Sequence, residues 1–231
     1  SLLAVSKTTA QDISRIIGRD DAQVVDISGA IELDYKRPEI DAPKIEITAL
    51  KPYLLFVGVT EPRKNLSGII RGFLEWRARP VADSDYKTVK LIITGELTPH
   101  GRALQKQYSE EAAILWLGTV SETAKNQLIK NARALMYPSF YEGFGLPLLE
   151  AEKAGIPIIS SNQSALSEIA SPRIVLADPY RPSTIANGLD LIFKNDLPPK
   201  NSLDPPAIIN RGLPFGETAL AALLKAANRR K

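Results

Sequence analysis

Two adjacent cations stand immediately before a predicted helix. The apolar run 53–57 is followed by Gly58-Val59-Thr60-Glu61-Pro62-Arg63-Lys64-Asn65, and Asn65 can cap the helix that comes next. Glycine at Gly58 lets a ligand approach the backbone. Free N–H groups and the helix dipole favour an anion, which arginine can grip as a fork and lysine as a point charge. The loop therefore predicts an anion site, with a solvated Arg-Lys pair as the alternative.

Two glutamates eight positions apart flank a second loop, Tyr141-Glu142-Gly143-Phe144-Gly145-Leu146-Pro147-Leu148-Leu149-Glu150. Pro147 suits the first position of a helix, so we expect Glu150 in the first turn and Glu142 in the loop before it. Carboxylates on both sides of free N–H groups suit a ligand with hydroxyls on both sides of a phosphate. The alternative is a set of acidic residues that complement the helix dipole. It explains Glu150, but not Glu142 or the Gly-Phe-Gly loop.

The composition excludes several other kinds of site. The chain has 231 residues, 44% of them hydrophobic and 24% charged, the mix of a soluble globular protein. It has no cysteine and one histidine, His100, which excludes disulfides, thiolate metal sites and multi-histidine zinc sites. The net charge of +3 is spread along the chain rather than gathered into a nucleic-acid-binding stripe. No apolar run reaches the ~18 residues of a membrane span. We expect a cytoplasmic protein, with contact at the inner membrane face left open.

Short apolar runs alternate with amphipathic stretches from residue 53 onward. The runs have the β-branched and aliphatic residues of strands buried on both faces, and they are 53–57, 89–94, 114–117, 134–137, 156–160 and 174–176. Between them we predict a helix capped by Asn65 and others near 101–112, 121–132, 147–154, 164–170 and 182–194, with Ser121 and Ser183 as caps. The pattern predicts an α/β fold, a Rossmann-like parallel sheet with helices on both faces. Ligands bind outside the carboxyl ends of such strands.

The remaining segments divide the chain further. Residues 1–33 predict a strand, a helix near 8–17 and a strand near 23–27. Residues 34–51 are charged, contain two prolines and predict a linker to the sheet domain, 52–196. Residues 197–231 predict a proline-rich connection and a last helix near 217–227. Because the first strand, at 1–5, has no element before it, we expect residue 1 to be a cut in a longer protein.

Several motifs together resemble those of the retaining glycosyltransferases of family four, which have the GT-B fold. Glu-Gly-Phe-Gly-Leu-Pro-Leu-Leu-Glu-Ala at 142–151 and Ala-Gly-Ile-Pro-Ile at 154–158 resemble the family signature. Phe56-Val57-Gly58, Pro62-Arg63-Lys64-Asn65 and Leu117-Gly118-Thr119-Val120-Ser121 fit the same family. The resemblance implies the C-terminal, nucleotide-sugar-binding half of a GT-B fold. Residues 1–33 would then be a remnant of the N-terminal, acceptor-binding domain.

The resemblance also implies roles for individual residues. Arg63 and Lys64 would hold the donor diphosphate and, in place of a metal, stabilise the charge on the leaving group. Glu142 would contact hydroxyls of the transferred sugar as a positioning group, and Glu150 would accept hydrogen bonds from the ribose. Catalytic roles thus fall on Glu142, Arg63 and Lys64. The further binding positions implied are Gly58, Gly95, the backbone at Val120 beside the base, Gly143, and the N–H groups of Phe144, Gly145 and Leu146.

The implied reaction is retaining sugar transfer from a nucleotide-diphospho-sugar, such as GDP-mannose or a UDP-sugar. The acceptor would be a glycan or lipid-linked acceptor in polysaccharide or lipopolysaccharide synthesis. No cofactor or metal is expected, and the partners are the donor, the acceptor and the missing N-terminal domain, with no nucleic acid and at most peripheral membrane contact. A GT-B-fold epimerase or phosphorylase and a non-catalytic nucleotide-binding module remain alternatives. With most of the first domain missing, we expect weak nucleotide binding and poor turnover.

Other polar features have simpler interpretations. Asp83-Ser84-Asp85 matches the acidic pair by which metal-dependent glycosyltransferases hold manganese. It precedes the strand at 89–94, on the edge away from the site, so we interpret it as a solvated loop. His100 is interpreted as a surface loop residue. The basic tail, Lys225 and 229–231, is interpreted as cations favourable at a helix C-terminus rather than as a membrane contact.

Overall fold

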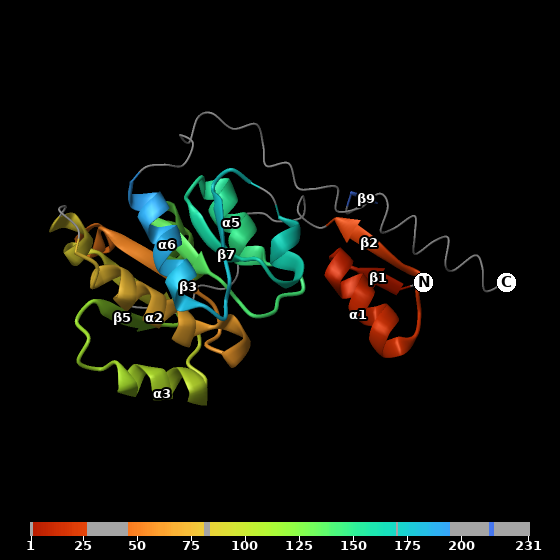
Figure 1. Cartoon of the computed structure of the whole chain (residues 1–231), viewed down its shortest axis with the longest axis horizontal. Coiled ribbons are helices and arrows are strands. Elements are labelled where there is room, and N and C mark those ends of the chain that lie inside the picture. Colours follow the sequence, from red (N-terminus) through yellow and green to blue (C-terminus); the bar gives the residue numbers. More distant parts are fainter. Residues whose placement is uncertain (1, 27–45, 81–83, 170, 195–212, 215–231) are drawn as a thin grey trace.

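The computed structural model describes residues 2–26, 46–80, 84–169, 171–194 and 213–214. They form a six-stranded and a three-stranded sheet with their helices (Figure 1). The predicted linker residues 34–45, the proline-rich residues 197–212 and the last helix near 217–227 lie outside the described residues.

The larger sheet has the order β5-β4-β3-β6-β7-β8, and every neighbouring pair is parallel. Its strands are β3 (Tyr53–Val57), β4 (Lys90–Thr94), β5 (Ile114–Gly118), β6 (Ala134–Tyr137), β7 (Ile158–Ser161) and β8 (Ile174–Ala177). The predicted fold class is confirmed. The chain runs outward from β3 to β5 and then returns to β6 on the other side of β3. This reversal is the topological switch point where ligands bind in open α/β sheets.

Helices cover both faces of this sheet. On one face lie α2 (Leu66–Arg77), α3 (Pro99–Gln107) and α6 (Pro182–Phe193), packed on alternate strand residues such as Leu54 and Phe56. On the other face lie α4 (Glu122–Asn131) and α5 (Leu146–Ala154), packed on Leu55, Val57 and Ile92. Helices α2 and α6 lie side by side (Figure 1). Burial on both faces explains why the strands are apolar throughout.

Several local predictions are corrected by the structure. Helix α3 begins at Pro99, after the Thr98 cap, and ends at Gln107, so His100 lies in a helical turn and not in a loop. The predicted helix at 164–170 is instead a short 3-10 helix, Ser164–Glu168, because Ser164 has a φ of 54°, in the left-handed region. Strand β7 begins at residue 158, because the Ile156 N–H still bonds the carbonyl of Ala151 at the end of α5.

The two serine caps have different outcomes. The Ser121 hydroxyl accepts the Ala124 N–H at 3.1 Å, so this predicted cap of α4 is confirmed. The prediction for Ser183 is wrong. Helix α6 begins at Pro182, and Arg181 in the cap position makes no side-chain cap bond. The neighbouring hydroxyl, that of Thr184, accepts the Asp178 N–H at 3.0 Å and so holds the turn before the helix.

Residues 2–26 form a strand–helix–strand unit, as predicted. It consists of β1 (Leu2–Ala4), α1 (Lys7–Ile17) and β2 (Ala22–Asp26), with β1 and β2 parallel. A two-residue strand that the sequence did not predict, β9 (Leu213–Pro214), pairs with β2. The unit lies to one side of the larger sheet (Figure 1). The end of the predicted linker forms a 3-10 helix, Ile47–Leu50, whose Ile47 and Leu50 pack on the core of the larger domain.

Candidate functional site

The loop after β3 is fixed in place by Asn65. Its residues Pro62–Lys64 form a 3-10 turn, and Asn65 itself adopts a left-handed conformation with φ 56°. The Asn65 side chain accepts the Gly68 N–H at the start of α2 and donates to the carbonyls of Pro138 at 2.9 Å and Pro179 at 2.8 Å. One buried amide therefore joins the loops that follow β3, β6 and β8. The sequence predicted only its role as the cap of the helix.

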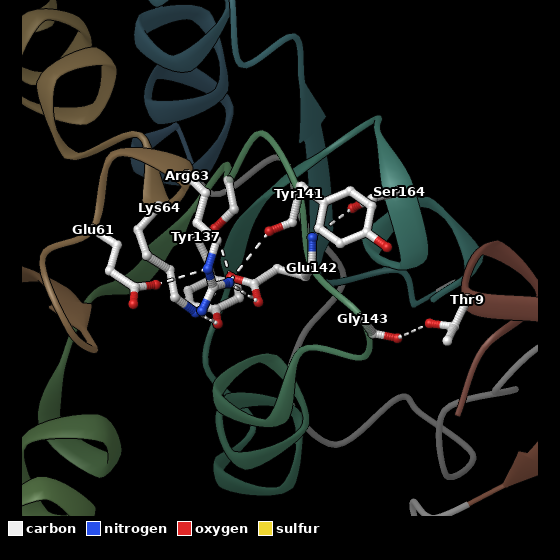
Figure 2. Close-up of polar contacts among 10 residues, drawn as sticks. Thr9, Glu61, Arg63, Lys64, Tyr137, Tyr141, Glu142, Gly143 and Ser164 are labelled. Carbon is white, nitrogen blue, oxygen red and sulfur yellow. Dashed lines mark hydrogen bonds and ion pairs between the residues drawn. The ribbon is translucent and has the colours of Figure 1, made fainter. Parts of the chain in front are cut away.

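Arg63, Lys64 and Glu142 meet at the switch point between β3 and β6 (Figure 2). Lys64 Nζ lies 2.5 Å from Glu142 Oε1, and Arg63 Nη1 lies 2.9 Å from Glu142 Oε2. Lys64 Nζ also donates to the Tyr137 hydroxyl at 2.6 Å, and Arg63 Nε lies 2.7 Å from Glu61 Oε2. The three residues given catalytic roles are thus in direct contact. The cluster holds two cations and two carboxylates.

The burial of these groups differs and shapes their pKa values. Lys64 is only 8% exposed, and this burial lowers the pKa of its ammonium, although Glu142 acts in the opposite direction. Burial also raises the pKa of the Tyr137 phenol, and the charge of Glu142 raises it further. Arg63 is more exposed. Burial alone would lower the pKa of its guanidinium, but the charges and hydrogen bonds of Glu142 and Glu61 outweigh burial and raise this pKa. At neutral pH the phenol therefore stays protonated and able to donate.

The loop between β6 and α5 presents a helix N-terminus beside this cluster. Gly145 has a φ of 99° and occupies the cap position of α5 without any side-chain cap bond. A Cβ at Gly145 would lie 2.6 Å from the end of the Leu166 side chain, and the positive φ disfavours any residue that has a Cβ. Because α5 begins at Leu146, with Pro147 second, Glu150 lies in the second turn and not in the first, which corrects the prediction. The uncapped first turn directs its dipole toward the loop, as an anion site requires.

Glu142 is held from several sides. Its carboxylate accepts the Ser139 hydroxyl at 3.0 Å. Its N–H donates to Ser164 Oγ at 3.0 Å (Figure 2). The Glu142 residue is 6% exposed. This network explains why a carboxylate can be buried here, since buried charges need partners. Of the other loop residues, Phe144 turns its ring into the core and Leu146 is exposed.

Glu150 occupies the same rim of the sheet. Its Oε1 lies 2.8 Å from Lys125 Nζ on α4. Its charge is among those that raise the pKa of the Tyr137 phenol, which itself contacts Lys64.

The glycines at the strand ends serve close packing. Gly95, with φ 128°, lies against Gly58, and a Cβ on Gly95 would lie 2.1 Å from the Gly58 carbonyl oxygen. The Gly58 N–H in turn bonds the Thr94 carbonyl at 3.0 Å. Gly95 thus supports the loop that carries Arg63 and Lys64. Val120, between β5 and α4, is half-buried and packs on the core of that face.

The strand–helix–strand unit reaches the same loops. Glu168 accepts the N–H groups of Lys7 at 3.0 Å and Thr8 at 2.8 Å, and the Thr8 hydroxyl at 2.7 Å. The Thr9 hydroxyl donates to the Gly143 carbonyl at 3.3 Å, next to Glu142 (Figure 2). The start of α1 therefore contacts the candidate site directly.

Sequence reasoning missed part of the site. The sequence indicates only a buried strand position for Tyr137, and it predicts no role for Ser139, Ser164, Lys125 or Glu61. Short polar residues in loops and a lysine on a polar helix face have no distinguishing pattern, and their positions follow from the tertiary fold.

The described residues contain neither a metal-binding group of carboxylates and histidine nor a membrane-spanning helix. Among the described residues, no group of three or more histidine, aspartate or glutamate side chains is arranged to hold a metal ion. Asp83 lies outside those residues, and Ser84–Thr88 form a 3-10 helix before β4, at the edge of the sheet away from the site. No helix in the described part of the chain is long and apolar enough to cross a bilayer.

Comparison with known proteins identifies the class first. In fold, the chain resembles the Anabaena protein HepE in complex with UDP and glucose (TM-score 0.69, 17% identity, 97% of this chain and 63% of that chain). It also resembles the C-terminal domain of LpcC, a glycosyl transferase group 1 family protein of Francisella tularensis (TM-score 0.51, 20% identity, 63% and 77%). The fold is that of the C-terminal domain of GT-B proteins.

The sequence comparisons then give the family. Residues 39–205 match the family model of the glycosyl transferases group 1. O-antigen chain mannosyltransferase B of Escherichia coli is 32% identical over 187 residues, which cover 77% of this chain and 47% of that protein. The chain belongs to the glycosyl transferases group 1, as its resemblance to family-four enzymes implied, and it spans less than half the length of this relative.

Proposed function

We propose that the chain binds a nucleotide-diphospho-sugar and presents it for retaining transfer. The observation that carries the proposal is the contact of Arg63, Lys64 and Glu142 at the switch point, beside the uncapped start of α5. Fixed cations and N–H groups suit a diphosphate. They would stabilise the negative charge that grows on the leaving nucleotide as the sugar departs.

In this proposal the diphosphate and Glu142 share the same cations. A bound diphosphate would draw Arg63 and Lys64 toward its oxygens and free part of the Glu142 carboxylate for hydroxyls of the sugar. Glu150 would accept the ribose hydroxyls, and the backbone near Val120 would face the base. Gly58, supported by Gly95, would let the phosphates approach the chain. Gly143 and the N–H groups of residues 144–146 would line the sugar side.

The relatives suggest the donor and the acceptor. The similarity to an O-antigen chain mannosyltransferase favours GDP-mannose as donor, with UDP-sugars next, and a glycan or lipid-linked acceptor of polysaccharide or lipopolysaccharide synthesis. Residues 1–33 would belong to the acceptor domain and 52–196 to the donor domain. We expect this chain alone to bind the donor but to transfer sugar slowly, at the cytoplasmic face of the membrane or in the cytoplasm. A radiolabelled-donor assay on the purified chain tests the slow turnover, and rapid transfer would contradict it.

A thermal-shift panel of GDP-, UDP-, ADP- and dTDP-sugars tests donor binding. A ligand that binds only the folded state at a hundredfold excess over Kd stabilises it by about 2.7 kcal/mol. Lys64→Ala should weaken the binding of GDP more than the binding of guanosine, and Glu150→Ala should weaken the binding of both. Lys106→Ala replaces an exposed lysine of α3 and should change the binding of neither. EDTA should leave the binding of the nucleotide unchanged, since Arg63 and Lys64 take the place of a metal ion in this proposal. The absence of any shift across the panel would refute the proposal.

A further inference from the structure

Lys125 joins two carboxylates on neighbouring helices. Its Nζ lies 2.8 Å from Glu122 Oε2 on its own helix, α4, and 2.8 Å from Glu150 Oε1 on α5. The side chains of Lys125 and Glu150 are 16% and 15% exposed. Burial alone would lower the pKa of Lys125, but the hydrogen bonds and charges of Glu122 and Glu150 outweigh burial and raise it. The ammonium thus stays charged and engaged with Glu150.

The second oxygen of Glu150 is in a different position. Oε2 is buried, and within the described residues no hydrogen-bond donor reaches it. A buried acceptor without a donor is unfavourable and rare in native proteins. One carboxylate therefore has one oxygen bonded to Lys125 and the other without a donor, which a ligand at this position would supply.

The charges around this point disfavour an anionic group. The group around Glu150 has one net negative charge, since it consists of Glu122, Lys125 and Glu150. The group around Arg63 has no net charge, since it pairs the cations Arg63 and Lys64 with the carboxylates of Glu61 and Glu142. A phosphate would be repelled at Glu150 and attracted at Arg63. A negative, partly buried acceptor forms strong hydrogen bonds with hydroxyl donors, which carry no negative charge.

We propose that Lys125 is a positioning residue. It holds one oxygen of Glu150 so that the other oxygen accepts hydrogen bonds from the 2′- and 3′-hydroxyls of the donor ribose. This rests on the proposed function, in which Glu150 faces the ribose. Lys125 acts through Glu150 and does not itself touch the nucleotide. A carboxylate fixed at one oxygen loses less conformational freedom when it binds a hydroxyl. Removal of the lysine should therefore weaken recognition of the ribose and leave recognition of the diphosphate intact.

Calorimetric titration of the 231-residue chain with GDP and UDP, each compared with its 2′,3′-dideoxy counterpart, tests this. The wild type should bind the better ribonucleotide at least about tenfold more tightly than its dideoxy form, the value of one hydrogen bond to a charged group. Lys125→Met should lose most of this ratio while its Kd for the dideoxy nucleotide stays the same. Lys125→Arg, which keeps a cation, should retain the ratio. A merely structural lysine would change both affinities together.

The outcomes separate the two proposals. If neither GDP nor UDP binds the wild type, the proposed function fails and this inference with it. If one binds but the wild type does not distinguish the dideoxy form, or if Lys125→Met keeps the full ratio, the positioning role is overturned while diphosphate binding stands. Should Lys125→Met fail to fold, Glu122→Gln loosens the lysine from its other side. It should also lower the ratio, and an unchanged ratio there would overturn the inference.

Discussion

Lys64 Nζ and Glu142 Oε1 lie 2.5 Å apart, so the lysine assigned to the donor phosphates is paired with the carboxylate assigned to the sugar. Both side chains are less than a tenth exposed. Buried ion pairs have large and opposing desolvation and Coulomb contributions, so their net effect on stability is small, but loss of one partner leaves an uncompensated charge. The pair therefore constrains the site more than it stabilises the fold.

Removal of Lys64 alone should destabilise the chain more than removal of the pair. We expect Lys64→Met to lower the free energy of unfolding by about 3 kcal/mol, since it removes the buried cation paired with Glu142 Oε1 at 2.5 Å. The double variant Lys64→Met/Glu142→Gln should recover much of the loss. Urea unfolding of the two single variants and the double variant gives the coupling energy. Lys106→Met, at an exposed position of α3, is the control, and strictly additive effects of the two substitutions would contradict this prediction.

The positions of the principal site residues could be predicted because parallel strands bring their following loops to one edge. Arg63, Lys64 and Glu142 each follow a strand recognisable from its apolar run, and Asn65 marked the start of α2. Strand order was not readable, so the placement of β6 next to β3, which brings Glu142 to Lys64, is a tertiary result.

Other features of the fold and the site could not be predicted, because they depend on local backbone conformation or on contacts with distant helices. Ser164 takes a left-handed conformation that serine rarely adopts, so an apolar pattern at 164–170 wrongly predicted an α-helix. Glu150 moved from the first turn to the second because the helix begins one residue earlier than Pro147 indicated. Lys125 lies 25 residues from Glu150, and no local pattern relates them.

Glu152 on α5 should make the stability of the chain depend on pH. Burial raises the pKa of its carboxyl, against the smaller opposing effects of Ser171 and Arg173. The folded state therefore keeps the proton at pH values where the unfolded state has lost it, and stability falls as pH rises above the ordinary value of 4.5. Glu152→Gln, which is neutral throughout, should have a higher Tm than wild type at pH 7 and a similar Tm at pH 4. Glu110→Gln, at an exposed position, should show neither effect, and an equal benefit of Glu152→Gln at both pH values would count against burial as the cause.

Gly95 and Gly118 offer a test of the strain and packing behind the cation loop. Their φ values are 128° and 65°, so alanine is more strained at Gly95, where an added Cβ would also lie 2.1 Å from the Gly58 carbonyl oxygen; at Gly118 it would meet nothing within 4 Å. Gly118→Ala should cost about 1 kcal/mol from backbone strain alone. Gly95→Ala should cost roughly 3 kcal/mol, since overpacking adds to strain, and should weaken nucleotide binding by displacing Gly58. Chemical denaturation measures both, and equal losses would show that the contact with Gly58 relaxes freely.

Glu168 should hold the strand–helix–strand unit against the loops of the site. Its carboxylate accepts two N–H groups and one hydroxyl at the start of α1, the work of a helix cap supplied from 160 residues away. Such caps contribute about 1 kcal/mol, and the negative charge at the helix N-terminus adds to it. Glu168→Ala should therefore speed hydrogen exchange of the α1 amides, with Glu168→Gln intermediate because it keeps one acceptor oxygen.

Hydrogen exchange in the central strands distinguishes a local loss of the contacts between α1 and the site loops, here called the seam, from a general loss of stability. Amides of β3 and β4 should keep wild-type protection in Glu168→Ala, because those strands are buried between the two helical layers. Ser6→Ala, which removes the local cap of the same helix, should speed exchange in α1 while Glu168 still holds the start of the helix against the loops. Glu168→Ala should in addition loosen the loop at Gly143, since the Thr9 hydroxyl that bonds the Gly143 carbonyl moves with α1. Uniformly faster exchange in all strands would mean that Glu168 supports the whole fold and not this seam.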